Sequence, residues 1–445
     1  MVKKIRTGKF YSDYRKGPEG EMEKLIIEGK TSLKGQVNIS GSKNASLPII
    51  AASLLIEGEC HLKNVPQLTD VKVMSEIMER LGAKVEKKEG ELKIDTSSII
   101  EDEVPPELLG MLRASILILS PLLFRKRRAK LTLPGGCNIG KRPVDLHLKG
   151  LSEMGVLFEV NNGYIKAKIK SFLKGGDIHL NFPSVGATEN LILAASVAKG
   201  ETIIKNASQT PEVVDLCNFL QKAGVKIEGV GTSTLKIKGK NSLSPVTHQI
   251  IPDRIEAGTF IMMAGITGGE VLIRKAKAEH LANPISLFKS MGLQIEVEGE
   301  NIFVRRSSSL KPIKVKTMPY PGFPTDLQPQ LTALTCAVEG ESHITETIFE
   351  SRFSHIPELR KMGANIEREN AKIKVKGGIP LKGTEVKAYD IRGGAALVLA
   401  GLCAEGKTHL LNSYYLDRGY EKIEEKISSL GANIKRVKGG NEDLG

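Results

Sequence analysis

Aromatic residues are scarce in this sequence: they make up 4% of its 445 residues, and tryptophan is absent. Proteins that bind single-stranded nucleic acids stack the bases on aromatic rings, so this composition disfavours that class. The sequence also lacks an apolar run near the ~20 residues that a membrane-spanning helix needs. Its longest run, 116–124, contains Ser120 and Pro121 and leads into basic residues, which predicts a buried helix followed by a basic turn. We therefore expect no membrane insertion.

Cysteine pairs and targeting signals are missing as well. The five cysteines form no CxxC pair, so they predict neither a disulfide framework nor a zinc site. The N-terminal segment has no apolar core and does not resemble a secretory signal. These absences lead us to expect a cytoplasmic protein.

Basic residues are in excess, with 64 Lys and Arg against 51 Asp and Glu, a net charge of 64 − 51 = +13. Such an excess attracts anions of many kinds, from nucleic acids to small phosphorylated substrates. Most basic residues are scattered among acidic ones; the exception is 125–130, with five basic residues in six positions. Charge runs are usually solvated, so we interpret 125–130 as a surface loop.

Glycines recur along the chain with a period of about 70 residues. Gly82 ends the first predicted amphipathic helix, and equivalent glycines follow at intervals of 73, 69, 68, 71 and 68 residues: Gly155, Gly224, Gly292, Gly363 and Gly431. A second glycine precedes these by 23 to 25 residues in five of the six units: Gly58, Gly200, Gly269, Gly340 and Gly406. Both kinds are expected to end helices in the left-handed conformation that glycine adopts readily.

Each repeat has the pattern of an α/β unit. We expect the first strand of the chain over about 22–40. An apolar helix such as 47–56 is followed by an alternating stretch, an amphipathic helix and two further strands. We predict β-α-β-α-β-β in each unit, and units of this size must complete one another's cores. Two lobes of three repeats are the natural grouping, and ligand pockets often form at domain interfaces. The sequence thus predicts a ligand site between two lobes.

One cysteine stands in a context unlike that of the other four. Cys137 lies in Pro-Gly-Gly-Cys-Asn-Ile-Gly-Lys-Arg-Pro (134–143), with Lys141 and Arg142 within five residues of it. Nearby cations lower a thiol's pKa and raise its thiolate fraction, so this is the cysteine placed to react. On the residues alone, a glycine-rich turn with an incidental cysteine is the alternative.

Two stretches suggest phosphate binding. Residues 40–45 (Ser-Gly-Ser-Lys-Asn-Ala) place Lys43 in a turn at a helix start, which suits a phosphate but is equally explained by ordinary capping. Residues 401–408 match the P-loop pattern, yet that motif must follow a strand and open a helix. Here a predicted helix precedes it and a predicted strand follows, so we reject a P-loop.

Charged residues combine with glycine or proline at four places in the second half of the chain: 321–326, 350–352, 390–394 and 417–419. Each begins or ends a predicted helix, so these positions should cluster at one end of their lobe. They would frame an anion-binding cleft together with residues of the other lobe: Lys43, Arg113, Cys137 and Arg142. Surface ion pairs at helix ends are the alternative for any one of them.

Taken together, these motifs resemble one enzyme family. The segments that occur in the family's order are 42–44 (Ser-Lys-Asn), 112–115 (Leu-Arg-Ala-Ser), the Cys137 loop with 142–147 (Arg-Pro-Val-Asp-Leu-His), 183–188, 324–326, 347–352 and 417–420. From Met22 to Gly439 the chain is similar to the UDP-N-acetylglucosamine 1-carboxyvinyltransferases, a branch of the enolpyruvyl transferase (EPSP synthase) family.

The resemblance implies an inside-out α/β barrel of two domains, each with three βαβαββ repeats around buried helices. It implies an N-terminal extension (1–21), a first lobe (43–251) that carries the Cys137 loop, and a second lobe (22–42 plus 252–439). It also implies transfer of the enolpyruvyl group of phosphoenolpyruvate to the 3-hydroxyl of UDP-N-acetylglucosamine, the first committed step of peptidoglycan synthesis. Fosfomycin is the expected inhibitor, and neither a cofactor, nor a metal, nor a nucleic-acid partner is expected.

The resemblance also assigns roles by position. Cys137 is implied as the general acid at C3 of phosphoenolpyruvate, able also to attack C2, and Asp326 as the carboxylate that takes or orients the proton of the 3-hydroxyl. Lys43 and Arg418 complete the implied catalytic set. The residues implied to bind phosphoenolpyruvate are Lys43, Asn44, Arg142, Arg392 and Arg418. Those implied to bind the UDP-sugar are Arg113, Arg142, Pro143, Val144, Asp145, Leu146, Ser184, Val185, Asp326 and Ile348.

Two features depart from the family pattern. Residues 1–21 precede the family's usual start near Met22, and Phe182 stands where some members have a lysine that reaches towards the nucleotide. Two other functions remain to be weighed. An EPSP synthase-like transferase acting on another acceptor would have no cysteine loop, and a nucleic-acid-binding repeat protein would leave that loop unexplained.

Overall fold

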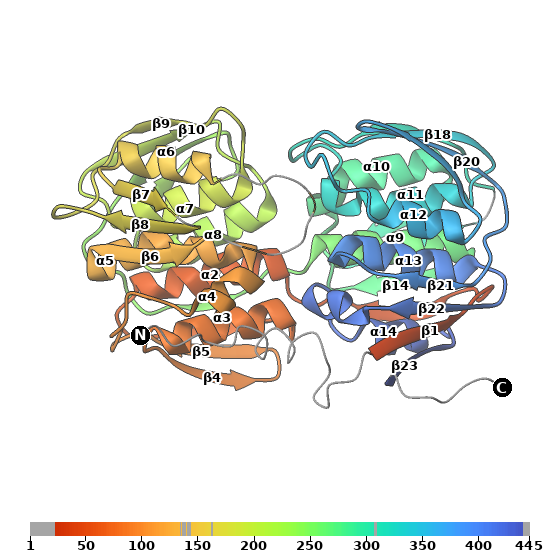
Figure 1. Cartoon of the computed structure of the whole chain (residues 1–445), viewed down its shortest axis with the longest axis horizontal. Coiled ribbons are helices and arrows are strands. Elements are labelled where there is room, and N and C mark those ends of the chain that lie inside the picture. Colours follow the sequence, from red (N-terminus) through yellow and green to blue (C-terminus); the bar gives the residue numbers. More distant parts are fainter. Residues whose placement is uncertain are drawn as a thin grey trace. The chain divides into compact units, whose positions relative to one another are not determined.

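A computed structural model of the chain describes residues 23–133, 135, 139, 144–161, 163–306 and 309–438. The described residues divide into two compact units. The N-terminal unit holds 40–133, 135 and 144–252, and the C-terminal unit holds 23–39, 139 and 253–438. Figure 1 shows that each unit combines helices with several small sheets, so the chain is a mixed α/β protein.

The N-terminal unit contains three sheets, in the strand orders β13-β3-β5-β4, β11-β12-β10-β9 and β6-β8-β7. Its strands are β3 (Glu59–Lys63), β4 (Lys84–Lys88), β5 (Glu91–Asp95), β6 (Arg128–Thr132), β7 (Leu157–Asn161), β8 (Tyr164–Lys168), β9 (Asp177–His179), β10 (Glu201–Lys205), β11 (Lys226–Glu228), β12 (Thr234–Lys238) and β13 (Thr247–Gln249). Alternate residues of each strand face the core; in β3, Cys60 and Leu62 are fully buried opposite Ile94 and Leu92 of β5.

The helices of the N-terminal unit are of two kinds. They are α2 (Lys43–Ala52), η1 (Ser53–Leu55), α3 (Thr69–Arg80), α4 (Pro106–Met111), η2 (Arg113–Ile118), α5 (Leu119–Lys126), α6 (Asp145–Glu153), α7 (Val185–Ala195) and α8 (Pro211–Lys222). Helices α2 and α7 carry small or apolar residues on nearly every side and are buried from their third residue onward. Helices α3 and α8 are amphipathic, with polar residues on the outward side.

The C-terminal unit contains three sheets of four strands, in the orders β21-β22-β1-β23, β15-β16-β14-β2 and β17-β18-β20-β19. Its strands are β1 (Glu23–Glu28), β2 (Lys34–Asn38), β14 (Glu270–Arg274), β15 (Leu293–Glu298), β16 (Asn301–Arg306), β17 (Lys314–Lys316), β18 (Gly340–Thr345), β19 (Asn365–Glu369), β20 (Lys372–Gly377), β21 (Glu385–Lys387), β22 (Lys407–Leu411) and β23 (Ile434–Lys438).

Three helices form the centre of the C-terminal unit. Its helices are α9 (Arg254–Thr267), η3 (Ala278–Leu281), α10 (Ala282–Met291), η4 (Thr325–Leu327), α11 (Gln328–Cys336), α12 (His355–Lys361), α13 (Ile391–Cys403), η5 (Ser413–Arg418) and α14 (Ile423–Ser429). Helices α9, α11 and α13 pack on one another and are buried along almost their whole length. Asp326 in η4 lies just before α11, and Arg392 lies in the first turn of α13.

Five of the six described sheets share one hydrogen-bonding pattern. A parallel pair, such as β17 and β18, is extended by two antiparallel strands, here β20 and β19. In the sixth sheet, the described strands β6, β8 and β7 are all antiparallel, and a single parallel bridge between Glu103 and Lys130 stands where the fourth strand would be.

The recurring glycines adopt the conformation that helix ends require. Gly82 and its five equivalents have φ between 91° and 108°, which is the left-handed region. Of the second set, four have positive φ, but in the remaining repeat Gly268 rather than Gly269 ends the helix, with φ 64°. The end predicted for helix α9, Gly269, was therefore one residue too late.

Three expectations about local structure need correction. Residues 22–40 do not form one strand: β1 and β2 are separated by a turn in which Lys30 has φ 58°, and they belong to different sheets. The apolar helix expected over 47–56 begins already at Lys43, because Ser42 caps it there. The basic run 125–130 is not a loop; it ends α5, turns at Arg127 (φ 61°) and begins β6.

The rejection of the P-loop at 401–408 is confirmed. Helix α13 precedes the glycine at position 406 and strand β22 follows it, the reverse of the order that a P-loop requires. Gly406 has φ 84° and follows the end of α13.

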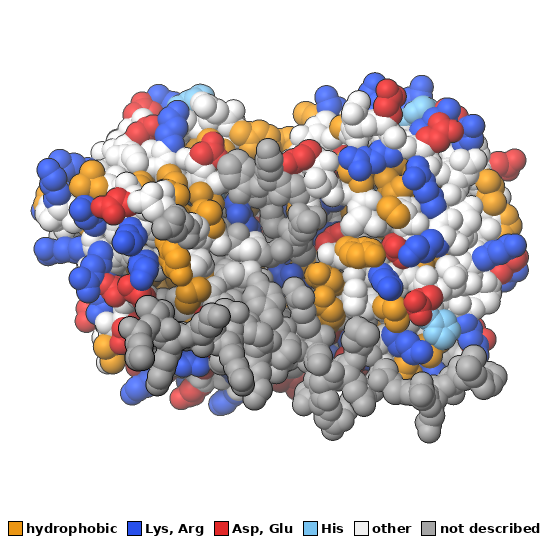
Figure 2. All heavy atoms as spheres, viewed as in Figure 1, with side chains coloured by type: hydrophobic (Ala, Val, Ile, Leu, Met, Phe, Trp, Pro, Cys, Tyr) orange, Lys and Arg blue, Asp and Glu red, His pale blue; other side chains and the backbone are white. Residues whose placement is uncertain are grey.

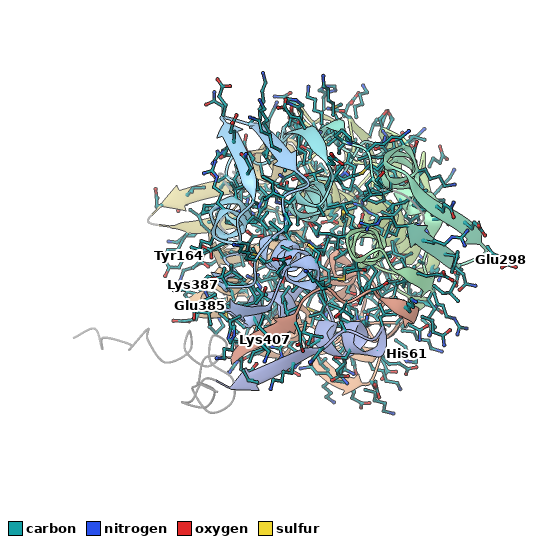
Figure 3. All side chains as sticks on the ribbon, turned by 90° about the vertical axis from the view of Figure 1, so that its right-hand side faces the viewer. His61, Tyr164, Glu298, Glu385, Lys387 and Lys407 are labelled. Atoms are coloured by element: carbon teal, nitrogen blue, oxygen red, sulfur yellow. The ribbon has the colours of Figure 1, made fainter. Side chains whose placement is uncertain are left out.

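Charged side chains of both signs are scattered over the visible surface of each unit, among hydrophobic and other side chains (Figure 2). Glu385 and Lys387 of β21 and Lys407 of β22 are exposed residues of one sheet and lie near one another in Figure 3. Within the residues that the structure describes, every helix is too short or too polar to cross a bilayer.

A buried pair of acids in the N-terminal unit leads to a prediction about stability. Glu189 of α7 is 5% exposed. Its burial raises its pKa well above the usual value, and the nearby Glu212 is a second, smaller cause of this increase. The folded chain therefore binds a proton at Glu189 that the unfolded chain releases above about pH 4.3, so stability is lost as pH rises towards the folded-state pKa. Glu189→Gln mimics the protonated form and should raise the free energy of unfolding at pH 7.5 by about 1 kcal/mol or more.

Urea unfolding at pH 5.0 and pH 7.5 measures this effect. The gain from Glu189→Gln should be larger at pH 7.5. Glu228→Gln, which replaces an exposed glutamate of β11 in the same unit, is the control and should change little at either pH. A gain for Glu189→Gln that is independent of pH would contradict the interpretation.

Candidate active site

The start of helix α2 holds the first predicted phosphate-binding lysine. The Ser42 side chain accepts a hydrogen bond from the Ala45 N–H (3.3 Å) and caps the helix. The Lys43 side chain is 12% exposed, and its Nζ lies 3.3 Å from Oδ2 of Asp70, near the start of α3. Asp70 thus fixes the direction of the ammonium group, and the partly buried Asn44 follows it on the helix.

His147 connects three of the segments implied to bind the UDP-sugar. It lies on α6, and its Nδ1 is 3.1 Å from Nδ2 of Asn190 on α7. Burial and, second, the charge of Arg113 on η2 lower the pKa of His147 to about 3. The ring is therefore neutral at physiological pH, accepts at Nδ1 and carries its proton on Nε2. A Cβ at position 186 would lie 3.3 Å from its Cε1, so Gly186 is what allows the start of α7 to approach the ring.

The implied UDP-sugar residues of the N-terminal unit stand at two helix starts. They are the cap and first two residues of α6 (Val144, Asp145 and Leu146) and the cap and first residue of α7 (Ser184 and Val185). Ser184 accepts a hydrogen bond from the Ala187 N–H (3.4 Å), and Val185 is 37% exposed. Two helix N-termini held together through His147, with Arg113 beside them, favour binding of an anion such as a diphosphate.

In the C-terminal unit, Asp326 lies between two arginines. Its Oδ1 is 2.6 Å from Nη1 of Arg352, and its Oδ2 is 3.2 Å from Nη2 of Arg392. Both arginine side chains are almost fully buried, at 6% and 4% exposure, whereas the Asp326 side chain is 23% exposed. The carboxylate is therefore held from the inside by two buried cations and is itself partly exposed.

Arg392 is surrounded by buried residues of the C-terminal unit. It follows Asp390, whose carboxylate caps α13 by accepting from the N–H groups of Arg392 (3.0 Å) and Gly393 (2.9 Å). Its guanidinium lies 5.2 Å from the ring centre of Tyr420, whose hydroxyl contacts Gln330 Nε2 (2.9 Å). Burial alone would lower the pKa of Arg392, but the negative groups around it, Asp326 among them, raise it above the usual value. This cation is therefore permanently charged.

Arg418 ends the 3₁₀ helix η5, which packs on α13. A Cβ at position 419 would lie 3.7 Å from Nη1 of Arg392, so the residue after Arg418 adjoins the Asp326 cluster. The preceding Asp417 points elsewhere: it accepts two hydrogen bonds from Arg436 of β23, at 2.7 and 3.0 Å. Arg436 thereby fixes the turn that presents Arg418.

Ile348 lies in the loop after β18, and its N–H donates to Oε1 of Glu346 at 2.8 Å. The backbone N–H of Ser351, in the same loop, donates to the carbonyl oxygen of Ile139 at 3.2 Å. Three of the predicted site residues lie outside the described residues: Cys137, Arg142 and Pro143.

The structure thus groups some of the predicted residues and adds others. Asp326, Arg392 and the end of η5 form one cluster, as the placement of charged motifs at helix ends predicted. No individual role was predicted from the sequence for Asp70, Arg352, Glu346, His147 or Tyr420. All five are buried ionisable residues, and three of them (Arg352, His147 and Tyr420) lie within the motif segments, so a search for ionisable residues in apolar contexts would have found them.

Known proteins are similar to this chain along nearly its whole length. Residues 27–427 match the family model for EPSP synthase (3-phosphoshikimate 1-carboxyvinyltransferase). UDP-N-acetylglucosamine 1-carboxyvinyltransferase 2 of Carboxydothermus hydrogenoformans is 50% identical over 418 residues, which cover 94% of this chain and 100% of that protein. UDP-N-acetylglucosamine 1-carboxyvinyltransferase 1 of Clostridium acetobutylicum is 48% identical with the same coverage.

A solved structure extends the similarity to the fold. The crystal structure of the enolpyruvyl transferase NikO from Streptomyces tendae matches with a TM-score of 0.87 at 27% sequence identity. The match covers 94% of this chain and 100% of that one.

Proposed function

Since the chain belongs to the EPSP synthase family of enolpyruvyl transferases, we propose that it transfers the enolpyruvyl group of phosphoenolpyruvate to the 3-hydroxyl of UDP-N-acetylglucosamine and releases phosphate. The observation that carries this proposal is the 50% identity, over 94% of the chain, to a protein named for that activity. The reaction commits UDP-N-acetylglucosamine to peptidoglycan synthesis, and thus serves cell-wall growth and division. We expect it to take place in the cytoplasm, without membrane insertion and without a nucleic-acid partner.

The finer architecture is part of the proposal. The chain shares a mixed α/β fold with NikO. We propose that the six sheets and their buried helices form the inside-out barrel of the family, with three βαβαββ repeats in each domain. We also propose the domain limits taken from the sequence, which are 43–251 for the first domain and 22–42 plus 252–439 for the second. The same proposal includes a substrate site between these domains.

The proposed roles in the C-terminal unit follow from the surroundings of Asp326. Its partly exposed carboxylate accepts the hydrogen of the sugar's 3-hydroxyl while two arginines hold it in place. Arg392 and Arg418 take part in binding phosphoenolpyruvate, with Lys43, Asn44 and Arg142. Phosphoenolpyruvate is a compact anion, and fixed cations stabilise the charge that shifts within it during the reaction.

The reaction proceeds by addition and elimination. The 3-hydroxyl oxygen attacks C2 of phosphoenolpyruvate, its proton leaves towards Asp326, and Cys137 donates a proton to C3. Loss of a proton from C3 then restores the double bond as the C2–O bond to phosphate breaks. The UDP-sugar is held at the two helix starts around His147 (Val144, Asp145, Leu146, Ser184 and Val185), together with Arg113, Arg142, Pro143 and Ile348.

The competing acceptor is shikimate 3-phosphate, because the family model that matches the chain is named for that activity. Phosphate release from phosphoenolpyruvate should be measured with UDP-N-acetylglucosamine, with shikimate 3-phosphate and with neither. Release that depends on UDP-N-acetylglucosamine supports the proposal. Release that depends on shikimate 3-phosphate alone would replace it with the EPSP synthase reaction.

A further inference from the structure

A buried carboxylate stands behind the Asp326 cluster. Glu346 follows β18 directly and is 2% exposed. Its Oε1 accepts hydrogen bonds from Thr317 Oγ1 (2.9 Å), Ile348 N (2.8 Å) and Phe349 N (3.1 Å). Its Oε2 accepts from Thr325 Oγ1 (2.9 Å). Four donors from three separate segments thus converge on one side chain.

One branch of this network leads to Asp326. A carboxylate only accepts and a guanidinium only donates, so the Thr325 hydroxyl must donate to Glu346 and accept from Nη1 of Arg352, which lies 2.9 Å away. The same Nη1 donates to Oδ1 of Asp326 at 2.6 Å. The charge of Glu346 therefore orients Thr325, and Thr325 helps to fix the arginine that holds Asp326.

The other branch leads to the loop that carries Ile348. Two backbone N–H groups of this loop donate to Glu346, and Thr317 holds the residue before them. The Thr317 hydroxyl donates to Glu346 and accepts from the N–H of Thr347 at 2.8 Å, while the Thr347 hydroxyl donates to the Thr317 carbonyl at 2.5 Å. Glu346 is therefore the common anchor of the Asp326 turn and of the Ile348 loop.

We propose that Glu346 is a positioning residue that sets Asp326 and the Ile348 loop in register for the acceptor sugar. It does not touch substrate; it acts through Thr325 and Arg352 on one side and through backbone N–H groups on the other. This inference rests on the proposed function, in which Asp326 meets the sugar's hydroxyl and Ile348 meets the UDP-sugar.

The branches can be separated by isosteric changes. Glu346→Gln keeps an acceptor for the three donors at Oε1 but places an N–H₂ group opposite Thr325, which reverses that hydrogen bond. Thr325→Val removes the same link from the other end. Both variants should lower kcat at least about tenfold, because small misplacements of a reacting group are costly, and should leave KM for UDP-N-acetylglucosamine within about threefold. Thr317→Val loosens only the loop and should mainly raise that KM.

A double-mutant cycle distinguishes this role from a merely structural one. If Glu346 acts through Thr325, the double variant Glu346→Gln/Thr325→Val should lose no more kcat than the larger single loss. The matched control is Glu358→Gln, because Glu358 is equally buried, at 2%, and accepts from Lys387 N (2.9 Å) and from Lys361. It should lower the unfolding midpoint while kcat stays within about twofold.

The outcomes are distinct. Losses that multiply in the double variant, or a Glu346→Gln enzyme with kcat within twofold of the unchanged chain, would overturn the inference while the proposed function stands. If Glu346→Gln does not fold, an unchanged kcat in Thr325→Val would overturn it equally. If the unchanged chain releases no phosphate in the presence of UDP-N-acetylglucosamine, the proposed function fails and the inference fails with it.

Discussion

Asp326→Asn is expected to lower kcat for phosphate release by at least about 100-fold, the lower range for loss of an acid–base group. The amide keeps the size of the side chain but replaces an oxygen by a donor that meets either Arg352 or Arg392, both of which only donate. It also offers the sugar's hydroxyl a weaker acceptor, and it cannot take the proton. Steady-state kinetics with both substrates at saturation measure kcat directly.

The control separates chemistry from the loss of an ion pair. Asp102→Asn also removes an arginine-paired carboxylate, since Asp102 Oδ2 pairs with Nε of Arg128 in the N-terminal unit. We expect this variant to lose some stability and to keep kcat within about threefold. If Asp326→Asn keeps nearly full kcat while remaining folded, Asp326 has no part in the proton transfer.

The buried helices and their ends could be predicted from the sequence because the relevant signals are local. Helix α13 is apolar on every side, and glycine at position 406 has the positive φ that follows a helix end. The break between β1 and β2 was not predicted from the sequence. What separates them is a close approach: a Cβ at Gly29 would lie 1.9 Å from the carbonyl oxygen of Ala404, far along the chain.

The candidate site shows the same limit. Placing the charged motifs at helix ends predicted that Asp326 and Arg392 would lie together, because equivalent helix ends of the repeats were expected at one end of the lobe. It did not predict which charges pair: Asp417 binds Arg436 rather than a residue of the Asp326 cluster. Nor could it find Glu346, because the donors Thr317 and Thr325 come from segments that only the folded sheet brings beside it.

Cys137 is expected to be the cysteine that fosfomycin alkylates, and its loss should abolish most of the activity. The sequence places two cations within five residues of its sulfur, which favours the thiolate. The other four cysteines lie among the described residues. Cys60, Cys217 and Cys336 are at most 2% exposed. Burial raises the pKa of these three thiols, that of Cys217 to about 12. Burial likewise raises the pKa of Cys403 to about 12. At pH 7.5 these four are almost entirely thiols and react slowly.

The expected result is one adduct per chain, located on Cys137 by peptide mass spectrometry, with activity lost in step with its formation. Bound UDP-N-acetylglucosamine should accelerate the alkylation, as the family resemblance implies. Cys137→Ala should lose at least about 100-fold in kcat, because no acid then protonates C3. Cys137→Asp should remain active and resist the drug, since a carboxylic acid can donate the proton but its carboxylate is a far weaker nucleophile towards an epoxide.

Cys217→Ala is the control and should be alkylated and inhibited like the unchanged chain. Adducts on any of the other four cysteines, or full activity in Cys137→Ala, would show that this thiol is not the reactive group.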